Sequence, residues 1–488
     1  MRGNGEGAAV ERHHRRPGPT RRRSIYVGGR GHSSLGSMGP FGVPGAIGGA
    51  PAGKSGLGPR LVVFAVAALL LWWVVSSVAS CAARPAALSD TGLSGEMASE
   101  PLGPTVSFVA VGDNLPEKTL GAYADSLAGE TGDGTYDYRP IYAPVRSYIE
   151  GADLAFVSQE VHLGGDDLGV QGYPSFNAPD DLADALVDTG FDLVASASNH
   201  CYDWGNFGAV EHSRELWNTK PVAFTGTATS QEEADSIPVV EREGITFALL
   251  DYTYGLNGFE PDDIPSYAVS FLDEDRIRSQ VAQAHELADV VVVAAHWGTE
   301  KQMEPDEQQL AYAQLFADLG VDIVLGSHPH VIGPVEWVEG SGGHKTLVAY
   351  ALGDFKSTHD TPHLESELAG MLACDFVREP PAGAEAAEGA GPDEEGAEAA
   401  PDADAAGDGA GDDRAAEQGP VTIQNVRWIP LVNHIEDGAH AVYALENYND
   451  ELVARHTFLS TQDNPLQWMR DTTEQVVHSR GADIPIEI

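Results

Sequence analysis

Residues 320–331 read GVDIVLGSHPHV, and they give the clearest indication of the architecture. The run 321–325 is apolar apart from one aspartate, which is typical of a buried β-strand. Directly after it come Ser327, His328 and His330. In open α/β sheets, ligands bind at the carboxyl ends of the strands, so this placement favours a ligand site. Two nearby histidines also occur on ordinary loops, and the other strand ends must decide between these interpretations.

Short apolar strands alternate with helical stretches on both sides of this segment. Strands are expected at 105–111, 153–157, 191–195, 289–295, 321–325 and 346–351, with two more within 239–251 around Glu243-Gly244. Helices are expected at 180–189, 273–287 and 306–319. Continuous apolar strands between helices predict parallel pairing with both faces of the sheet covered. The sequence therefore predicts an α/β fold.

Polar residues follow the ends of four further apolar strands. They are Gly112-Asp113, Gln159-Glu160, Ser198-Asn199-His200 and His296-Trp297-Gly298. Singly, each has an ordinary interpretation as a turn, a helix cap or a buried histidine. Gathered at one sheet edge, such oxygen and nitrogen ligands suit zinc, manganese or iron rather than calcium. Their combination favours a transition-metal site.

The charge of the chain divides it into two parts. The formal net charge is −46, which argues against a nucleic-acid partner because phosphate binding needs clustered Lys and Arg. Residues 1–60 are nevertheless basic, and the uncharged run 61–80, LVVFAVAALLLWWVVSSVAS, follows them. About 20 apolar residues suit a membrane-spanning helix, with the positive side cytoplasmic and the acidic remainder outside. A buried core helix is the disfavoured alternative.

The end of this run leaves two modes of attachment open. Residues 78–81, VASC, resemble a bacterial lipobox with Cys81 as the lipidated residue, so 61–81 is either a membrane anchor or a lipoprotein signal. Signal peptides have short N-terminal regions, and a start at Met38 would shorten this one. Cys201 and Cys374 could pair outside the cytoplasm. Two unpaired buried thiols are the favoured alternative.

One folded domain is expected, over 105–378 and 421–488. Residues 1–60 are expected to be disordered, and 82–104 to form a linker from the membrane. Residues 379–420 are Ala, Gly, Pro, Asp and Glu almost throughout, so they are expected to be a disordered acidic insert. The insert separates the strand-like 371–377 and 421–431, which predicts a hairpin with an expanded loop. An interdomain linker is the weaker alternative, because too little chain follows for a second core.

Six segments carry a resemblance to a known family. They are AVGDNL, DLAFVSQE, FNAPDDLADALVDTGFDLVASASNHCYDWG, AAHWGTE, GVDIVLGSHPHV and YALGDF. Over residues 105–355 the chain resembles the CapA family of poly-γ-glutamate capsule proteins, a branch of the calcineurin-like metallophosphoesterases. The resemblance implies a four-layer α-β-β-α sandwich, preceded here by a single transmembrane or signal-anchor helix.

The resemblance also implies roles for the matching residues. Two divalent ions, manganese, iron or zinc, are expected to be held by Asp113, Glu160, Asn199, His296, His328 and His330. Glu160 would bridge the ions, and His330 would complete the site of the ion bound by Asp113. His200 would be a proton donor or charge stabiliser rather than a ligand, with Asp203 orienting it.

Three departures from the family pattern leave the number of metal ions open. Asp113 is followed by Asn114 and Leu115, so there is no Asp-x-His after the first strand. Gln159 and Asp354 stand where the family usually has asparagines. The first ion therefore has fewer obvious ligands than in typical phosphoesterases.

The apolar run 61–80 and the basic residues before it lead us to expect a membrane-attached, extracytoplasmic protein. By the resemblance, it is expected to act in capsule or cell-envelope polymer formation as a metal-dependent hydrolase or transferase. Its substrate would be an anionic polymer or a phosphoester, and polyglutamate rests on the resemblance alone. A general metallophosphoesterase and a non-catalytic component of a capsule-synthesis complex are the alternatives. A Rossmann-like nucleotide binder is disfavoured, because no Gly-x-Gly-x-x-Gly follows the first strand.

Overall fold

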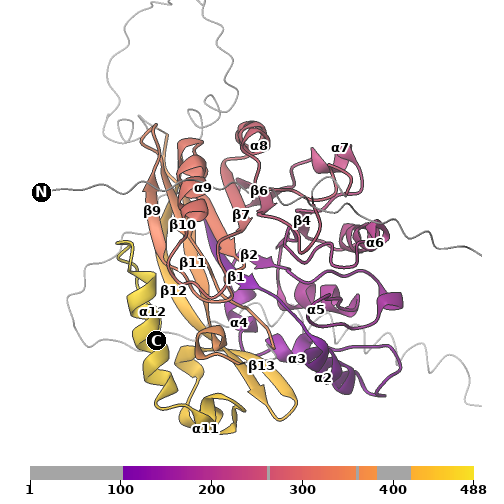
Figure 1. Cartoon of the computed structure of the whole chain (residues 1–488). Helices are drawn as coiled ribbons and strands as arrows, with labels where there is room; N and C mark the ends of the chain where they lie inside the picture. Colours follow the sequence, from indigo (N-terminus) through magenta and orange to yellow (C-terminus); the bar gives the residue numbers. More distant parts are fainter. Residues whose placement is uncertain (1–102, 261–263, 359–361, 382–418) are drawn as a thin grey trace, which may run out of the picture. The chain divides into compact units, whose positions relative to one another are not determined.

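The computed structural model describes residues 103–260, 264–358, 362–381 and 419–488 (Figure 1). The tail 1–60, the apolar run 61–80, Cys81 and nearly all of the linker 82–104 lie outside the described residues, as do 382–418 of the acidic insert. Within the described part of the chain, no helix is long and apolar enough to cross a membrane. All the described residues belong to one compact unit, Met97–Ile488.

Two β-sheets organise the described part of the chain. The seven-stranded sheet has the order β13-β12-β11-β1-β2-β3-β4, and the six-stranded sheet has the order β5-β6-β7-β8-β10-β9. The strands of the first are β1 (Thr105–Asp113), β2 (Leu154–Ser158), β3 (Leu193–Ala195), β4 (Ala223–Thr225), β11 (Leu368–Arg378), β12 (Val421–Glu436) and β13 (Ala439–Ala444). The strands of the second are β5 (Val239–Arg242), β6 (Ile245–Thr253), β7 (Val290–His296), β8 (Ile323–Ser327), β9 (Val335–Glu339) and β10 (Lys345–Ala349).

Parallel pairing, which the sequence predicted for the strands that alternate with helices, is found in part of each sheet. Strands β1 to β4 are parallel neighbours, and so are β6, β7, β8 and β10. Strands β11, β12 and β13 extend the first sheet antiparallel, and β5 and β9 do the same for the second. The sequence predicted the antiparallel hairpin of β11 and β12, but it did not predict the antiparallel edge strands β9 and β13.

The acidic insert connects two neighbouring strands. β11 and β12 pair antiparallel, with Arg378 opposite Val421 at the ends that lead into the insert. The Glu379 amide donates to the Pro420 carbonyl (2.8 Å), so the two ends of the insert meet. The expected hairpin is thus confirmed, and the interdomain linker is excluded.

The main core lies between the sheets. The ring of Phe376 on β11 meets those of Phe108 on β1 and Phe247 on β6 edge-on, at centroid distances of 5.6 and 5.1 Å. All three rings are at most 1% exposed. Phe247 comes from the second sheet and its two partners come from the first, so this aromatic cluster holds the sheets together.

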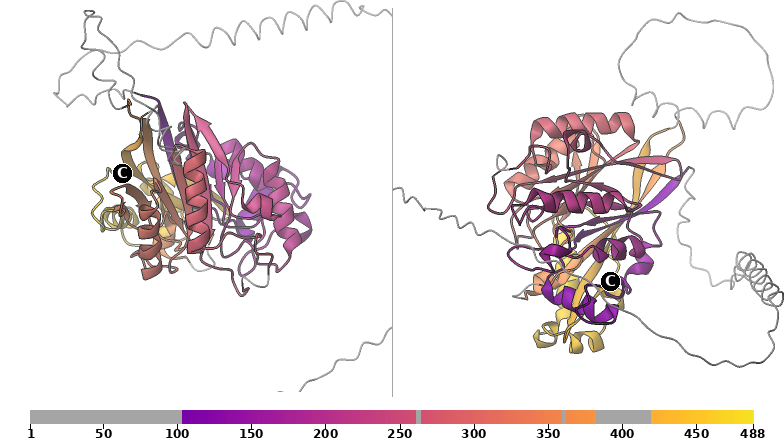
Figure 2. Two further views of the ribbon diagram at one scale, coloured as in Figure 1. Left: turned by 90° about the horizontal axis from the view of Figure 1, so that it is seen from above. Right: turned by 90° about the vertical axis from the view of Figure 1, so that its right-hand side faces the viewer.

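Helices cover the outer faces of both sheets, which makes the unit a mixed α/β sandwich (Figure 2). The helices longer than one turn are α2 (Lys118–Ala128), α5 (Asp181–Thr189), α6 (Phe207–Asn218), α8 (Glu274–Leu287), α9 (Glu307–Asp318), α11 (Asp450–Arg455) and α12 (Pro465–Val477). Three of them confirm the predicted helices. Helices α8 and α9 pack on the six-stranded sheet, and α5 packs on the other. Cys201 and Cys374 are buried and unpaired, as favoured.

The Phe376→Ala variant tests the core between the sheets. Removing a fully buried phenyl ring leaves a cavity, so the free energy of unfolding is expected to fall by about 3–5 kcal/mol. Urea denaturation of the variant and the wild type measures the difference. Tyr173→Ala serves as the control, because that side chain is 73% exposed and should matter by only about 0.5 kcal/mol. A loss below about 1 kcal/mol for Phe376→Ala would contradict this account.

Candidate metal centre

The predicted metal ligands come together where strands of both sheets end. β1 ends at Asp113 and β7 ends at His296, while Glu160 follows β2. Asn199 follows β3, and the histidines His328 and His330 follow β8. All six side chains are buried, with at most 6% exposed surface. The contacts described below link them into one cluster, although they lie far apart in sequence.

Glu160 occupies the middle of this cluster. Its Oε1 lies 3.9 Å from the Nε2 atoms of His200, His296 and His330. Neither carboxylate oxygen has a hydrogen-bond partner, and the residue is 1% exposed. An uncompensated buried carboxylate is strongly unfavourable. Contacts of 3.9 Å are too long for hydrogen bonds, but they suit donors sharing an ion at about 2 Å from each. The donor set therefore fits a bound cation.

Asp113 connects the two sheets at the site. Its Oδ1 accepts a hydrogen bond from Ser158 Oγ (2.9 Å), and its Oδ2 accepts one from the backbone amide of His328 (2.8 Å). His296 Nδ1 lies 3.8 Å from the same carboxylate. Burial raises the pKa of Asp113 to about 6, although the positive charge of His330 opposes this rise. A nearby cation would keep this carboxylate ionised.

Asn199, His296 and His328 form one side of the cluster. His296 Nε2 is 2.7 Å from Asn199 Oδ1, and the rings of His296 and His328 are 4.9 Å apart. His328 Nδ1 is buried without a hydrogen-bond partner. Burial lowers the pKa of both histidines, that of His328 to about 3. Both imidazoles are therefore neutral at neutral pH, which is the form that binds metals.

His330 is held from behind by Asp354. Its Nδ1 lies 2.8 Å from Asp354 Oδ1, and its Nε2 is the atom nearest Glu160. Burial lowers the pKa of His330, but the carboxylates of Asp354 and Glu160 outweigh burial and raise it to about 10. A carboxylate bound to one ring nitrogen fixes the other toward a metal. The sequence marked Asp354 only as a departure and did not predict this contact.

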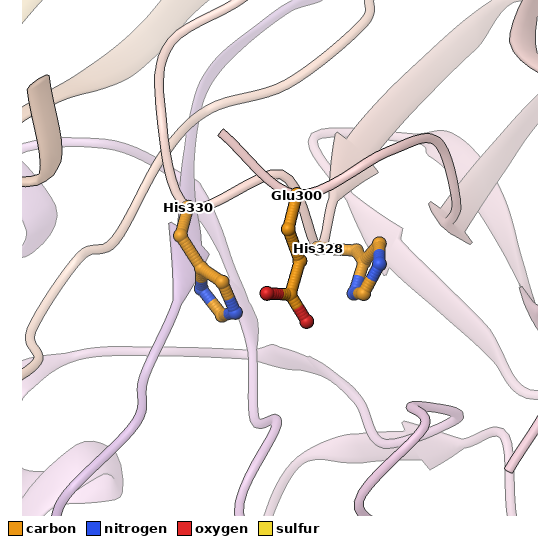
Figure 3. Close-up of side chains that lie close together, drawn as sticks. All are labelled: Glu300, His328 and His330. Carbon is orange, nitrogen blue, oxygen red and sulfur yellow. The ribbon is translucent and has the colours of Figure 1, made fainter. Parts of the chain in front are cut away.

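Glu300 is a further acidic residue at the site that the sequence did not single out. Its carboxylate and ring nitrogens of His328 and His330 all lie within 4.8 Å of one another (Figure 3). Glu300 is exposed, unlike the two histidines. The signal that could have revealed it is its place in the segment AAHWGTE, four residues after His296. It gives the site a solvent-facing oxygen donor.

His200 is oriented by Asp203, as the sequence predicted. Its Nδ1 lies 2.7 Å from Asp203 Oδ2, which also accepts a hydrogen bond from the Phe176 amide (2.9 Å). The Phe176 ring packs edge-on against the imidazole at 4.6 Å. These contacts direct Nε2 toward Glu160. When the ring is protonated, His200 can therefore present an Nε2–H group to a substrate in the site.

Two of the departures from the expected pattern bind each other beneath the site. Asn114 Nδ2 donates to Gln159 Oε1 (2.9 Å), and Tyr142 donates to Asn114 Oδ1 (2.9 Å). Gln159 Nε2 in turn donates to the Val161 carbonyl (2.7 Å). These amides are therefore engaged in a buried network that supports the strand ends.

Sequence comparisons find one family and two curated relatives. The model of the family described as "Bacterial capsule synthesis protein PGA_cap" matches residues 107–359. "PGA biosynthesis protein CapA" of Bacillus subtilis (strain 168) is 30% identical over 177 residues, which are 35% of this chain and 43% of the relative. "Capsule biosynthesis protein CapA" of Bacillus anthracis is 25% identical over 185 residues, 37% of this chain and 43% of the relative. The match thus spans less than half of each relative.

Solved structures show weaker similarity. A putative 5'-nucleotidase from Staphylococcus aureus aligns with a TM-score of 0.35 and 12% identity, over 76% of this chain and 58% of that one. A hypothetical protein from Thermus thermophilus aligns with a TM-score of 0.34 and 15% identity, over 56% of this chain and 94% of that one. At these levels, the structures carry no information on the activity of this chain.

Proposed function

Because the chain belongs to the bacterial capsule synthesis protein family PGA_cap, we propose that it acts in the formation of a capsule or cell-envelope polymer as a metal-dependent hydrolase or transferase. The observation that carries the catalytic part is Glu160, a buried carboxylate without a hydrogen-bond partner and 3.9 Å from three imidazole nitrogens. Without a metal, such a group is compensated only by its own protonation or by the protonated His330, and a bound cation would replace both.

Two divalent ions, manganese, iron or zinc, would be held by the six predicted ligands. Asn199, His296 and His328 would hold one ion, His330 and Asp113 the other, and Glu160 would lie between them. Bound there, the ions would supply a water of lowered pKa and electrostatic stabilisation of an anionic transition state. Their charge would also offset the net charge of −46, which otherwise repels an anionic substrate.

The protein's own groups would orient the substrate and move a proton. His200, held by Asp203, would donate the proton that the leaving group needs. Asp354 would keep His330 Nε2 directed into the site. Buried walls would exclude bulk water around Glu160 and Asp113, which strengthens every electrostatic contact there.

For the substrate, we favour an acidic polymer such as poly-γ-glutamate, in keeping with the name of the Bacillus subtilis relative. The scissile bond would then be an amide, whereas a phosphoester is the alternative for the same site. We also propose the four-layer α-β-β-α sandwich of the metallophosphoesterases. We further propose that residues 61–81 attach the domain to the cytoplasmic membrane, on its outer side.

Metal content and turnover of the purified full-length protein test this function. We expect about two equivalents of transition metal per chain by elemental analysis, and metal-dependent cleavage of oligo-γ-glutamate. Cleavage of simple phosphoesters alone would instead favour a general phosphoesterase. Absence of bound metal under metal-replete conditions, together with absence of turnover, would leave a non-catalytic role in a capsule-synthesis complex.

A further inference from the structure

A cavity lies beside the segment 355–358, which follows Asp354 of the metal centre. It has a volume of about 630 Å³ and is lined by residues that include Thr119, Thr358, Glu367, His440 and Arg455. Thr358 is four residues beyond Asp354, the partner of His330. Four residues span at most about 14 Å, so Thr358 in the cavity wall lies within that distance of Asp354.

His440 is the unusual residue of this cavity. It is 4% exposed, and neither of its ring nitrogens has a hydrogen-bond partner. The neighbouring histidines are satisfied: His434 Nδ1 is 2.6 Å from the Tyr448 hydroxyl, and His456 Nε2 is 2.9 Å from the Asn433 carbonyl. Unpaired buried polar groups destabilise a fold, so they usually have a ligand or a function. His440 therefore indicates a bound group in this cavity.

The charges around His440 favour an anion. Lys356 is fully buried, and its Nζ donates to the Ser357 carbonyl (3.0 Å) and to Asn433 Oδ1 (3.2 Å). Burial lowers the pKa of His440 to about 3, and the positive charges of Lys356 and His434 contribute to this lowering. The imidazole is thus a neutral hydrogen-bond donor in a positive field.

Other charged groups line the same cavity. Arg455 lies at its rim, with a side chain that is 54% exposed and 3.3 Å from Glu436. Glu367 lies 3.7 Å from His456 Nε2, and its charge also acts on Lys356. Asp437 is a second acidic residue in the lining. Lys356 is the cation whose charge acts on His440 from behind the cavity wall, and Arg455 is the cation at its rim.

Asn433 connects this cavity to the metal centre. Its Nδ2 donates to the Asp354 carbonyl (2.7 Å), and its Oδ1 accepts from Lys356 Nζ. The side chain thus fixes Lys356 relative to the segment that positions His330. A polymer with regularly spaced carboxylates could occupy both places at once.

We propose that this cavity is a carboxylate-binding subsite, in which His440 and Arg455 contact one acidic group of a polymer that extends into the metal centre, and the buried Lys356 behind them supplies positive charge. The carboxylate site is inferred only from the cavity and its side chains, and it does not depend on the proposed function. Its use by a polymer rests on the proposed function.

Calorimetric titration of the full-length protein with glutarate and with a γ-glutamyl pentamer tests this subsite. We expect saturable binding of both, at least 10-fold weaker in His440→Phe and about 3- to 10-fold weaker in Arg455→Gln. Arg427→Gln is the matched control: Arg427 is a partly exposed arginine on β12 that pairs with Glu487, outside the cavity, and the variant should bind like the wild type. Asp113→Asn should still bind glutarate, but it should lose the additional affinity for the pentamer.

The outcomes separate the subsite from the proposed function. Glutarate binding that is absent, or unchanged in both cavity variants, would overturn the subsite even if the protein binds metal and turns over substrate. Tighter binding of inorganic phosphate than of glutarate would also overturn it. Normal glutarate binding without metal or turnover would sink the proposed function and keep the subsite. His440→Phe should not lower Tm, because it removes two unpaired buried nitrogens. If Tm nevertheless falls in this variant, Arg455→Gln still tests the subsite, because Arg455 is exposed and its replacement should not affect folding.

Discussion

Replacing Glu160 with Gln is expected to lower the affinity for transition metal by on the order of 100-fold or more, since even outer-shell substitutions cost about 10- to 100-fold. The amide has nearly the same shape, but it lacks the negative charge that would balance ions on both sides. Competition with a chelator of known affinity measures the change. Glu150→Gln is the control, because Glu150 is an exposed surface residue paired with Arg146. An affinity within about 3-fold of wild type would remove Glu160 from the metal centre.

The same variant is expected to stabilise the metal-free protein. Burial and the neighbouring Asp113 raise the pKa of Glu160 well above 4.5. Between 4.5 and that raised pKa, the folded state holds a proton that the unfolded state has released, so the free energy of unfolding falls as pH rises. Glu160→Gln removes this dependence.

Thermal unfolding in a chelator between pH 5 and 8 checks this expectation. Wild-type Tm should fall more steeply with pH than the variant's, and added metal should reverse the order of the two proteins. Asp251 has a pKa raised to about 8 by burial and is present in both, so part of the slope should remain. Parallel pH profiles would show that Glu160 is ionised without a metal.

The strands that position the site could be predicted from sequence because burial on both faces leaves a continuous apolar run, as in β7 and β8. β9 has an alternating pattern instead, with Trp337 36% exposed, and β4 has only three residues. Neither gives a signal that stands out from a loop. The antiparallel edge strand β9 and the parallel edge strand β4 were not predicted for this reason.

The clustering of the six candidate ligands was predictable for a related reason. Each follows an apolar strand, and parallel strands end at the same edge of a sheet. The Asp203 partner of His200 lies three residues away and could be read from the sequence. Asp354 is 24 residues from His330, and Glu300 follows β7 on an exposed loop, so only the folded chain reveals their contacts.

Geometry alone does not distinguish His200 from the candidate metal ligands, because its Nε2 is as far from Glu160 Oε1 as those of His296 and His330. Its other nitrogen contacts Asp203, a pairing that serves a metal ligand and a proton donor equally well. The distinction is chemical. A ligand retains metal, whereas a proton donor matters only when the leaving group needs a proton.

His200→Ala is therefore expected to lower kcat by about 10²- to 10⁴-fold with its metal content unchanged. The loss should be largest for substrates with poor leaving groups, such as amides or alkyl phosphoesters, and small for a nitrophenyl ester, whose leaving group departs without protonation. Steady-state kinetics on the two classes, with elemental analysis of the same samples, measures both effects. His212→Ala removes a half-exposed histidine paired with Asp180 and should change neither. Loss of metal, or an equal loss of rate for both substrate classes, would make His200 a ligand rather than the proton donor.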